Sequence, residues 1–165
     1  MLERLRQVAF LVKDLEDAKS LYGRYLGMET CHSEDLSRYG LQNAVLPAGN
    51  GTFIELLQPT TGDSSAARYL ERRGEAPYML IFEAREYDRL IPHLKSLGVR
   101  LKEEPATGDC RHAFIHPSSA NGAFLEVIEV TSGDNPWPAA GPDWQTLARQ
   151  PLTKQIRQTA VLVRD

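Results

Sequence analysis

Two glutamates stand alone inside otherwise apolar segments that the sequence predicts to be β-strands. Glu55 lies in Thr52–Pro59, and Glu126 lies in Ala123–Val130. Burying a carboxylate without a partner is strongly unfavourable, so each side chain must be exposed on an edge strand, paired or bound to a metal. An exposed glutamate is the common case for a single strand. The occurrence of the same pattern twice favours a chemical role.

The pattern around these glutamates belongs to a longer internal repeat. Residues 53–56 read FIEL and residues 124–127 read FLEV, which places the two glutamates 71 positions apart. The Leu-Gly pairs that end at Gly27 and Gly98 are also 71 positions apart. We therefore predict an α+β fold of two paired modules, each a strand, a helix and three strands (βαβββ), at about residues 5–59 and 78–130.

Pairing of such modules about a pseudo-twofold axis would bring equivalent positions together in one cup. The first positions of the opening strands hold Gln7 and Met79, and the closing strands contribute Glu55 and Glu126. Three of these residues carry oxygen donors, which suit a divalent ion such as Mg²⁺, Mn²⁺, Co²⁺, Ni²⁺ or Zn²⁺. The thioether of Met79 is soft and suits Cu(I) instead. The residues therefore predict either a metal with three protein ligands and water, or an empty site.

The elements that position these residues follow from apolar spacing and capping residues. Asp14 is a plausible N-cap for a helix that ends at Gly27, and Asp63 or Ser64 caps a short helix that ends at Gly74. A further helix is expected near residues 86–97. The expected strands are Gln7–Val12, Met28–His32, Gly40–Leu46, Thr52–Pro59, Met79–Ala84, Val99–Glu103, His112–His116 and Ala123–Val130.

The C-terminal residues differ from the repeated modules. Residues 131–155 are rich in turn-forming residues and are expected to form an extended linker. Residues 156–165, IRQTAVLVRD, then repeat the pattern of residues 5–14, LRQVAFLVKD. We expect this stretch to be the opening strand of a further module, which suggests a tandem protein or a homodimer formed through the strand.

Composition excludes several classes of function. The net charge of −3 is spread along the chain, which argues against nucleic acid or an anionic membrane as the main partner. No apolar run is long enough to span a bilayer. Cys31 and Cys110 have no metal or redox spacing and are expected to be reduced thiols of a cytoplasmic protein.

Several short motifs resemble the vicinal-oxygen-chelate superfamily, which includes glyoxalase I, bleomycin-resistance proteins, extradiol dioxygenases and methylmalonyl-CoA epimerase. The epimerase branch is the most similar. The segments that carry the resemblance are Val12–Leu15, Leu46-Pro47, Glu55–Pro59, Asp63-Ser64, Tyr69–Glu75 and Phe114–Pro117. The resemblance implies the glyoxalase/bleomycin-resistance fold, in which two βαβββ modules form a cup-shaped open barrel around a metal.

Matched by position, the metal ligands of this family fall on Gln7, Glu55, Met79 and Glu126. The family usually has His where this chain has Met79. The resemblance also implies that Glu126 doubles as the base that moves a proton. Epimerases have a second glutamate in the loop where this chain reads Ser37–Tyr39, with Glu34 and Asp35 only nearby.

Two functional hypotheses remain open. The first is a metal-dependent isomerase, epimerase or lyase of the glyoxalase type, acting on a small carbonyl or acyl-thioester substrate through an enolate-like intermediate. Its expected metal ligands are Gln7, Glu55 and Glu126, with Glu126 also catalytic. The second is a metal-free module that binds a small molecule in the same cup. The residues expected to contact the small molecule in either case are Met79, Phe53, Phe124, Arg38 and His116.

Overall fold

The computed structural model describes residues 1–131, 133–148 and 152–160. The predicted α+β class is confirmed by the order of helices and strands. The chain divides into two compact units. Unit 1 comprises Met1–Gln7, Met79–Pro138 and Gln158–Asp165, and unit 2 comprises Val8–Tyr78 and Ala139–Arg157. Strands β1 (Leu2–Leu11) and β4 (Ala76–Ala84) each contribute residues to both units.

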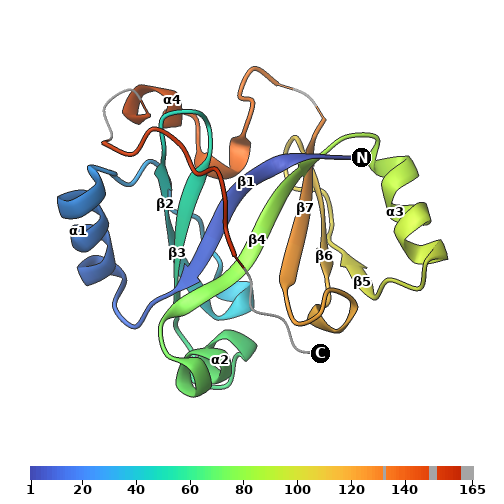
Figure 1. Ribbon diagram of the computed structural model, residues 1–165, viewed down its shortest axis with the longest axis horizontal. Helices are drawn as coiled ribbons and strands as arrows, with labels where there is room; N and C mark the ends of the chain where they lie inside the picture. Colours follow the sequence, from blue (N-terminus) through green and yellow to red (C-terminus); the bar gives the residue numbers. More distant parts are fainter. Residues whose placement is uncertain (132, 149–151, 161–165) are drawn as a thin grey trace. The chain divides into compact units, whose positions relative to one another are not determined.

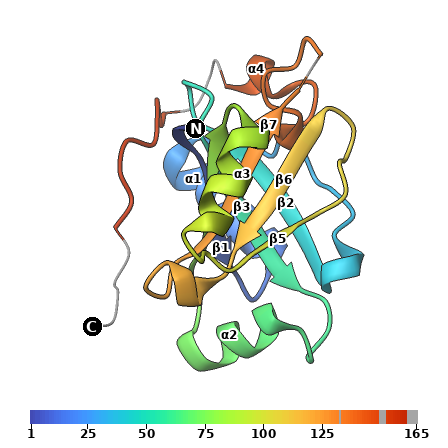
Figure 2. The same ribbon diagram turned by 90° about the vertical axis from the view of Figure 1, so that its right-hand side faces the viewer.

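Unit 1 contains strands in the order β1-β4-β7-β6-β5. Strand β7 is parallel to β4 and antiparallel to β6, which in turn is antiparallel to β5. The remaining elements of this unit are α3 (Tyr87–Ser96), β5 (Leu101–Glu103), β6 (Cys110–Ile115), η2 (Pro117–Ser119) and β7 (Phe124–Val130). Figure 2 shows α3 lying in front of β6 and β7.

The core of unit 1 lies between α3 and one face of its strands. Tyr87 and Ile91 of α3 pack with Ala113 of β6 and Val127 of β7, and all four are buried. Phe82 of β4 packs against this cluster, as the alternation of its strand predicts. The opposite face of the same strands is therefore available for other contacts.

Unit 2 contains β2 (Leu41–Pro47) and β3 (Phe53–Pro59) as an antiparallel pair, with β1 beside β3. Helix α1 (Leu15–Leu26) lies beside β2 and β3 (Figure 1). The unit also contains η1 (Ser37–Tyr39) and α2 (Ser65–Arg73).

The predicted helix caps are confirmed at both ends of α1 and α2. The carboxylate of Asp14 accepts a hydrogen bond from the Asp17 amide at 2.9 Å, and Gly27 ends α1 with a φ of 63°. Ser64, rather than Asp63, caps α2 by accepting from the Ala67 amide at 3.0 Å. Caps satisfy amides that the first helical turn leaves without partners, so these local signals could be recognised in the sequence.

The strand predicted over Met28–His32 is wrong for most of its length. The structure has only an isolated bridge between His32 and Val45, in which the Cys31 amide donates to the Val45 carbonyl and the Val45 amide donates to the His32 carbonyl. Met28 is nonetheless almost fully buried, at 1% exposure. The segment therefore anchors the chain by one apolar side chain and one bridge instead of a full ladder.

The segment expected to be an extended linker is instead packed. It contains η3 (Pro138–Ala140) and α4 (Trp144–Leu147), and the side chains of Trp137 and Trp144 are buried. Two buried indoles remove a large apolar area from water, which a flexible linker does not do.

The expected C-terminal strand is not present over residues 153–160, which carry no helix or strand, and residues 161–165 lie outside the described residues. The start of this tail is nevertheless attached to unit 2. The Gly49 amide donates to the Thr153 carbonyl at 3.2 Å, and the Ile156 amide donates to Thr52 Oγ1 at 2.9 Å.

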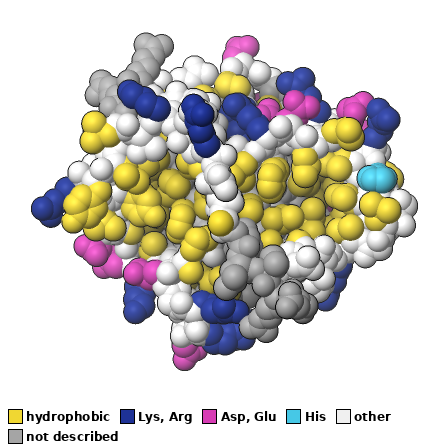
Figure 3. All heavy atoms as spheres, in the orientation of Figure 1, with side chains coloured by type: hydrophobic (Ala, Val, Ile, Leu, Met, Phe, Trp, Pro, Cys, Tyr) yellow, Lys and Arg dark blue, Asp and Glu magenta, His cyan; other side chains and the backbone are white. Residues whose placement is uncertain are grey.

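Helix α1 keeps apolar side chains in solvent. Leu21 and Tyr25 are 49% and 61% exposed. Figure 3 shows apolar side chains at the left edge of the face that it draws, where Figure 1 places α1. Among the described residues, no helix combines the length and the apolar character needed to cross a bilayer.

We expect Gly49→Ala to lower the free energy of unfolding by about 1–2 kcal/mol, because added volume in a packed place forces a shift. A Cβ at Gly49 would lie 2.8 Å from the Lys154 carbonyl oxygen and 3.3 Å from its Cα, so the tail backbone must move. Gly62→Ala is the matched control, since its Cβ would meet nothing within 4 Å. Urea unfolding of both variants measures the difference. Equal stabilities would show that the tail is not held at Gly49.

Candidate active site

The register of unit 1 gathers four of its side chains on the face opposite α3. Met79 of β4 lies beside Phe124 of β7, and Glu126 of β7 lies beside Phe114 of β6. Directly paired residues of neighbouring strands point to the same face, and adjacent residues of one strand point to opposite faces. Because Val127 faces α3, Glu126 and its neighbours occupy the other face. Three of the four, Met79, Phe124 and Glu126, are predicted site residues.

Glu126 is a buried carboxylate with an imidazole next to it. Its exposed fraction is 7%, and its Oε1 lies 3.2 Å from Nδ1 of His112 on β6. The contact is a hydrogen bond when His112 carries a proton on Nδ1 and an ion pair when the ring is fully protonated. His112 was not among the site residues predicted from the sequence. The structure makes it the direct partner of the predicted base.

The surroundings of this carboxylate are apolar and aromatic. The ring centroids of Phe114 and Phe124 are 5.6 Å apart, and the His112 ring lies 6.3 Å from that of Phe114. Met79 is 9% exposed. A carboxylate in apolar surroundings makes strong electrostatic contacts, because little water screens it.

Gln7 is held by a tryptophan that sequence reasoning missed. The exposed fractions of Gln7 and Trp137 are 2% and 0%, and the indole Nε1–H of Trp137 donates to Oε1 of Gln7. Trp137 is anchored in turn by its own backbone amide, which donates to Asn135 Oδ1 at 3.0 Å. The available signal was the pair of tryptophans in a segment otherwise typical of a linker.

An ion pair between Arg6 and Glu83 lies next to Trp137 in unit 1. Arg6 Nε lies 2.9 Å from Glu83 Oε2, and its guanidinium lies 4.9 Å from the ring centroid of Trp137. Burial lowers the pKa of Arg6, although Glu83 opposes this effect. Burial alone would raise the pKa of the Glu83 carboxyl, but the hydrogen bonds and charges of Arg6 and Arg4 outweigh it and lower that pKa.

Unit 2 contains the other predicted metal ligand. Glu55 is 6% exposed, and its Oε1 accepts a hydrogen bond from Nδ2 of Asn43 at 2.8 Å. Phe53, two residues earlier on the same face of β3, is fully buried and contacts Trp144 edge to face at 5.1 Å between ring centroids. The chain's own C-terminal segment therefore covers a side chain that was predicted to contact a substrate.

Arg38 and His116 have local roles in the structure. The guanidinium of Arg38, an exposed residue of η1, lies 4.5 Å from the ring centroid of its neighbour Tyr39. His116 is exposed and caps η2, with its Nδ1 accepting from the Ser118 amide at 3.1 Å. Their predicted contacts with a substrate stay predictions.

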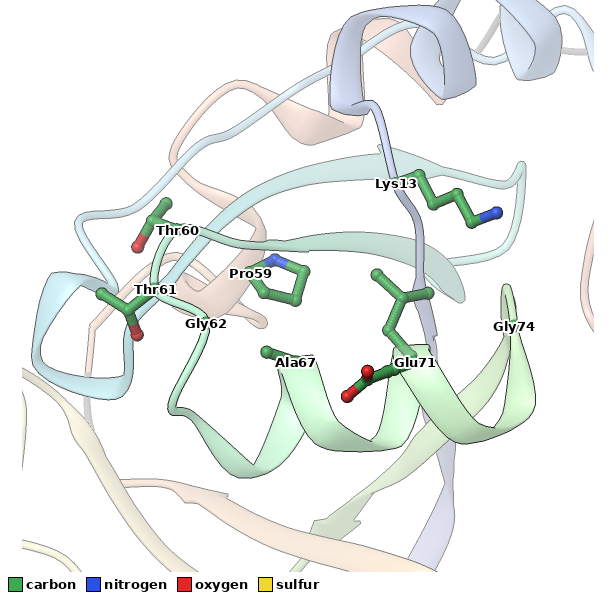
Figure 4. A pocket seen from close by; sticks show the side chains of 9 residues that line it. Lys13, Pro59, Thr60, Thr61, Gly62, Ala67, Glu71 and Gly74 are labelled. Atoms are coloured by element: carbon green, nitrogen blue, oxygen red, sulfur yellow. The ribbon is translucent and has the colours of Figure 1, made fainter.

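A pocket of about 500 Å³ lies in unit 2, away from every predicted site residue of that unit. It is lined by Lys13, which precedes α1, by residues at and just after the end of β3, and by α2 (Figure 4). Its charged side chains are Lys13 and Glu71, which point in different directions in Figure 4. We do not assign chemistry to this pocket, because it lacks convergent polar groups.

Among the predicted metal positions of unit 1, the thioether of Met79 does not suit a hard divalent ion, whereas the carboxylate of Glu126 does. The Gln7 oxygen already accepts from an indole, and Met79 offers a soft sulfur. Within residues 1–131, 133–148 and 152–160, no group of three or more His, Cys, Asp or Glu side chains is arranged to hold a metal. A divalent cofactor therefore stays a prediction for this site.

Residues 6–114 match the Glyoxalase/Bleomycin resistance protein/Dioxygenase superfamily. The chain belongs to this superfamily. The matched stretch contains Gln7, Glu55 and Met79, and it ends before Glu126 and Trp137. The fold class and the resemblance inferred from sequence are thus confirmed.

Relatives in this superfamily include epimerases. The ethylmalonyl-CoA/methylmalonyl-CoA epimerase of Cereibacter sphaeroides is 31% identical over 79% of this chain and its own full length. A methylmalonyl-CoA epimerase structure from Mycobacterium tuberculosis is 31% identical, with a TM-score of 0.73 over 79% of this chain and 90% of its own. A Streptomyces coelicolor epimerase variant in complex with 2-nitronate-propionyl-CoA is 26% identical, with a TM-score of 0.71 over 80% and 100% of the two chains.

We expect Glu83→Gln to lower the free energy of unfolding by about 3 kcal/mol at pH 7, because it leaves the buried Arg6 charge without its carboxylate. The lowered pKa of Glu83 means that its contribution is complete above pH 4.5, the ordinary value, and is lost as the pH falls through the folded pKa. The gap between variant and wild type should therefore shrink below about pH 4.

Asp88→Asn is the matched control for this test. Asp88 also pairs with an arginine, Arg111, but its side chain is 82% exposed. Exposed pairs of this kind contribute about 0–1 kcal/mol. Urea unfolding from pH 3 to pH 7 compares the two variants, and equal losses would show that burial of Arg6 does not matter.

Proposed function

We propose that this chain is an epimerase or isomerase that moves a proton at the carbon next to the carbonyl of an acyl thioester, with an acyl-CoA as the substrate class. The observation that carries the proposal is the buried Glu126 carboxylate, which lies among aromatic side chains and 3.2 Å from the His112 imidazole. The epimerase names of the relatives support the substrate class.

In this proposal Glu126 is the general base. Its carboxylate takes the α-proton, the C–H bond breaks, and the electron pair moves to the carbonyl to give an enolate. Return of the proton from Glu126 to the same face gives exchange alone, whereas epimerisation requires an acid on the opposite face of the enolate to donate a proton. A base of this kind works best when its pKa lies near the working pH and its position is fixed.

His112 has a positioning role in the proposed mechanism. An imidazole N–H that donates to Oε1 of Glu126 fixes the orientation of the carboxylate. The aromatic rings of Phe114 and Phe124 lie on the same face of the sheet as this carboxylate. Exclusion of water from a site of this kind protects the enolate from protonation by solvent.

A metal-free binding module is the second candidate. It is favoured by the contact between Phe114 and Phe124 next to Met79, which together form an apolar surface suited to an aromatic or aliphatic ligand. Binding of an acyl-CoA without exchange of its α-proton would support this candidate and exclude the enzyme for that substrate.

We expect Glu126→Gln to slow α-proton exchange by about 10²–10⁴-fold, because an amide cannot accept the proton. The measurement is deuterium incorporation into methylmalonyl-CoA and ethylmalonyl-CoA in D₂O, followed by mass spectrometry. Glu129→Gln is the matched control on the same strand, since Glu129 pairs with Arg111 and the Tyr87 amide instead. Exchange at the wild-type rate in the folded Glu126→Gln variant would contradict the assignment of the base.

A further inference from the structure

The apolar side chains around Glu126 differ in how much of their surface solvent can reach. The residues paired directly with Glu126 are Ile81 of β4 and Phe114 of β6, and its neighbours on the same face of β7 are Phe124 and Ile128. Ile81 and Ile128 are 2% and 6% exposed, whereas Phe114 and Phe124 are only half-buried. Among these four residues, the accessible apolar surface therefore belongs to the two phenylalanine rings.

Met79 extends the surface that these rings present. The ring centroids of Phe114 and Phe124 are 5.6 Å apart, and Met79 is paired directly with Phe124 across the β4–β7 ladder. A methionine side chain is unbranched and adapts its shape to an apolar group that lies against it. Met79, Phe114 and Phe124 thus form one apolar surface on the same face as the candidate base.

The polar partner of Glu126 lies toward the other end of β7. His112, which contacts Oε1 of Glu126, is paired with Ile128. Ile128 and Phe124 are each two residues from Glu126, in opposite directions along the strand. The imidazole can therefore hold the carboxylate from one direction while Phe124 stays available to a ligand on the other.

We propose that Met79, Phe114 and Phe124 form the subsite for the alkyl substituent on the α-carbon of the acyl-CoA. This role rests on the proposed function: when Glu126 takes the α-proton, that carbon lies against its carboxylate, and its substituents extend over the neighbouring side chains. Directly paired residues such as Glu126 and Phe114 have Cβ atoms only about 4.5–5.5 Å apart. An alkyl group removes apolar surface from water there, whereas a charged group would lose its hydration without gaining a partner.

Such a subsite predicts selection by the size of the α-substituent. Ethylmalonyl-CoA has one methylene more than methylmalonyl-CoA at this position. One methylene in an apolar pocket changes kcat/KM by about 10–200-fold, and half-buried rings give the lower end of that range. We expect kcat/KM for α-proton exchange to be about 10-fold higher for ethylmalonyl-CoA, measured in D₂O by mass spectrometry. A ratio below about 3 for the wild-type protein would overturn the inference.

Phe114→Ala tests whether these residues make the selection. It removes the ring directly beside Glu126, so the ratio of the two kcat/KM values should fall to below about 3. Phe82→Ala is the matched control, because Phe82 is also half-buried in unit 1 but packs against the core on the opposite face. Its ratio should equal that of the wild type. An unchanged ratio in Phe114→Ala, or an equal fall in Phe82→Ala, would overturn the assignment.

The ratio is independent of how much of a variant is folded, since both substrates are measured on one sample. Circular dichroism establishes that each variant is folded. Phe124→Ala removes the second ring of the same subsite and takes the place of Phe114→Ala if that variant does not fold. The ratio for the wild-type protein needs no variant.

Binding measurements separate this inference from the proposed function. If both CoA esters exchange with equal kcat/KM, the proposed function stands and the alkyl subsite fails. If neither ester exchanges its α-proton, the proposed function fails, and calorimetry of the wild-type protein with the same two esters still tests the subsite. Tighter binding of ethylmalonyl-CoA, lost in Phe114→Ala and kept in Phe82→Ala, would support it, and equal affinities would overturn it.

Discussion

The alternation of side chains along β7 is the constraint on which unit 1 depends. This strand is paired on both sides, with β4 and with β6, so its register is fixed along two edges. Val127 enters the core under α3, and the adjacent Glu126 must face the other way. A slip of one residue would exchange them and place a carboxylate beneath the helix without a partner, which is strongly unfavourable. The same register of β7 therefore both packs the core and places the candidate base.

Each buried polar side chain described near this site in unit 1 has a specific partner. Glu126 contacts His112, and the oxygen of Gln7 accepts from Trp137. Arg6 contacts Glu83 and the face of the same indole. A hydrogen bond strengthens in a medium of low dielectric constant, and an unsatisfied polar group becomes costly there. The same surroundings that make a carboxylate a useful base therefore require the fixed network around it.

The sequence was sufficient to predict features that depend on local chemistry. The caps at Asp14 and Ser64, the helix ends at Gly27 and Gly74, and most strands follow from spacing alone, because their causes lie within a few residues. The repeat also indicated a chemical role for Glu126. The role of Trp137 could not be predicted, because its partner Gln7 lies 130 positions away in the chain. The strand prediction over Met28–His32 was wrong for a related reason. A strand forms only where a neighbouring segment pairs with it over several residues, and here the pairing is limited to the bridge between His32 and Val45.

The C-terminal tail shows that the same sequence pattern can form a strand in one place and not in another. Residues 156–160 repeat the start of the pattern that forms β1, yet they carry no strand in the described part of the chain. In β1 the same residue types lie between neighbouring strands, which supply hydrogen-bond partners on both sides. The tail instead uses single backbone contacts, such as the Ile156 amide to Thr52 Oγ1. Preference for a strand is mainly a preference for a paired and half-buried setting, so an equal pattern gives a strand only where such a setting exists.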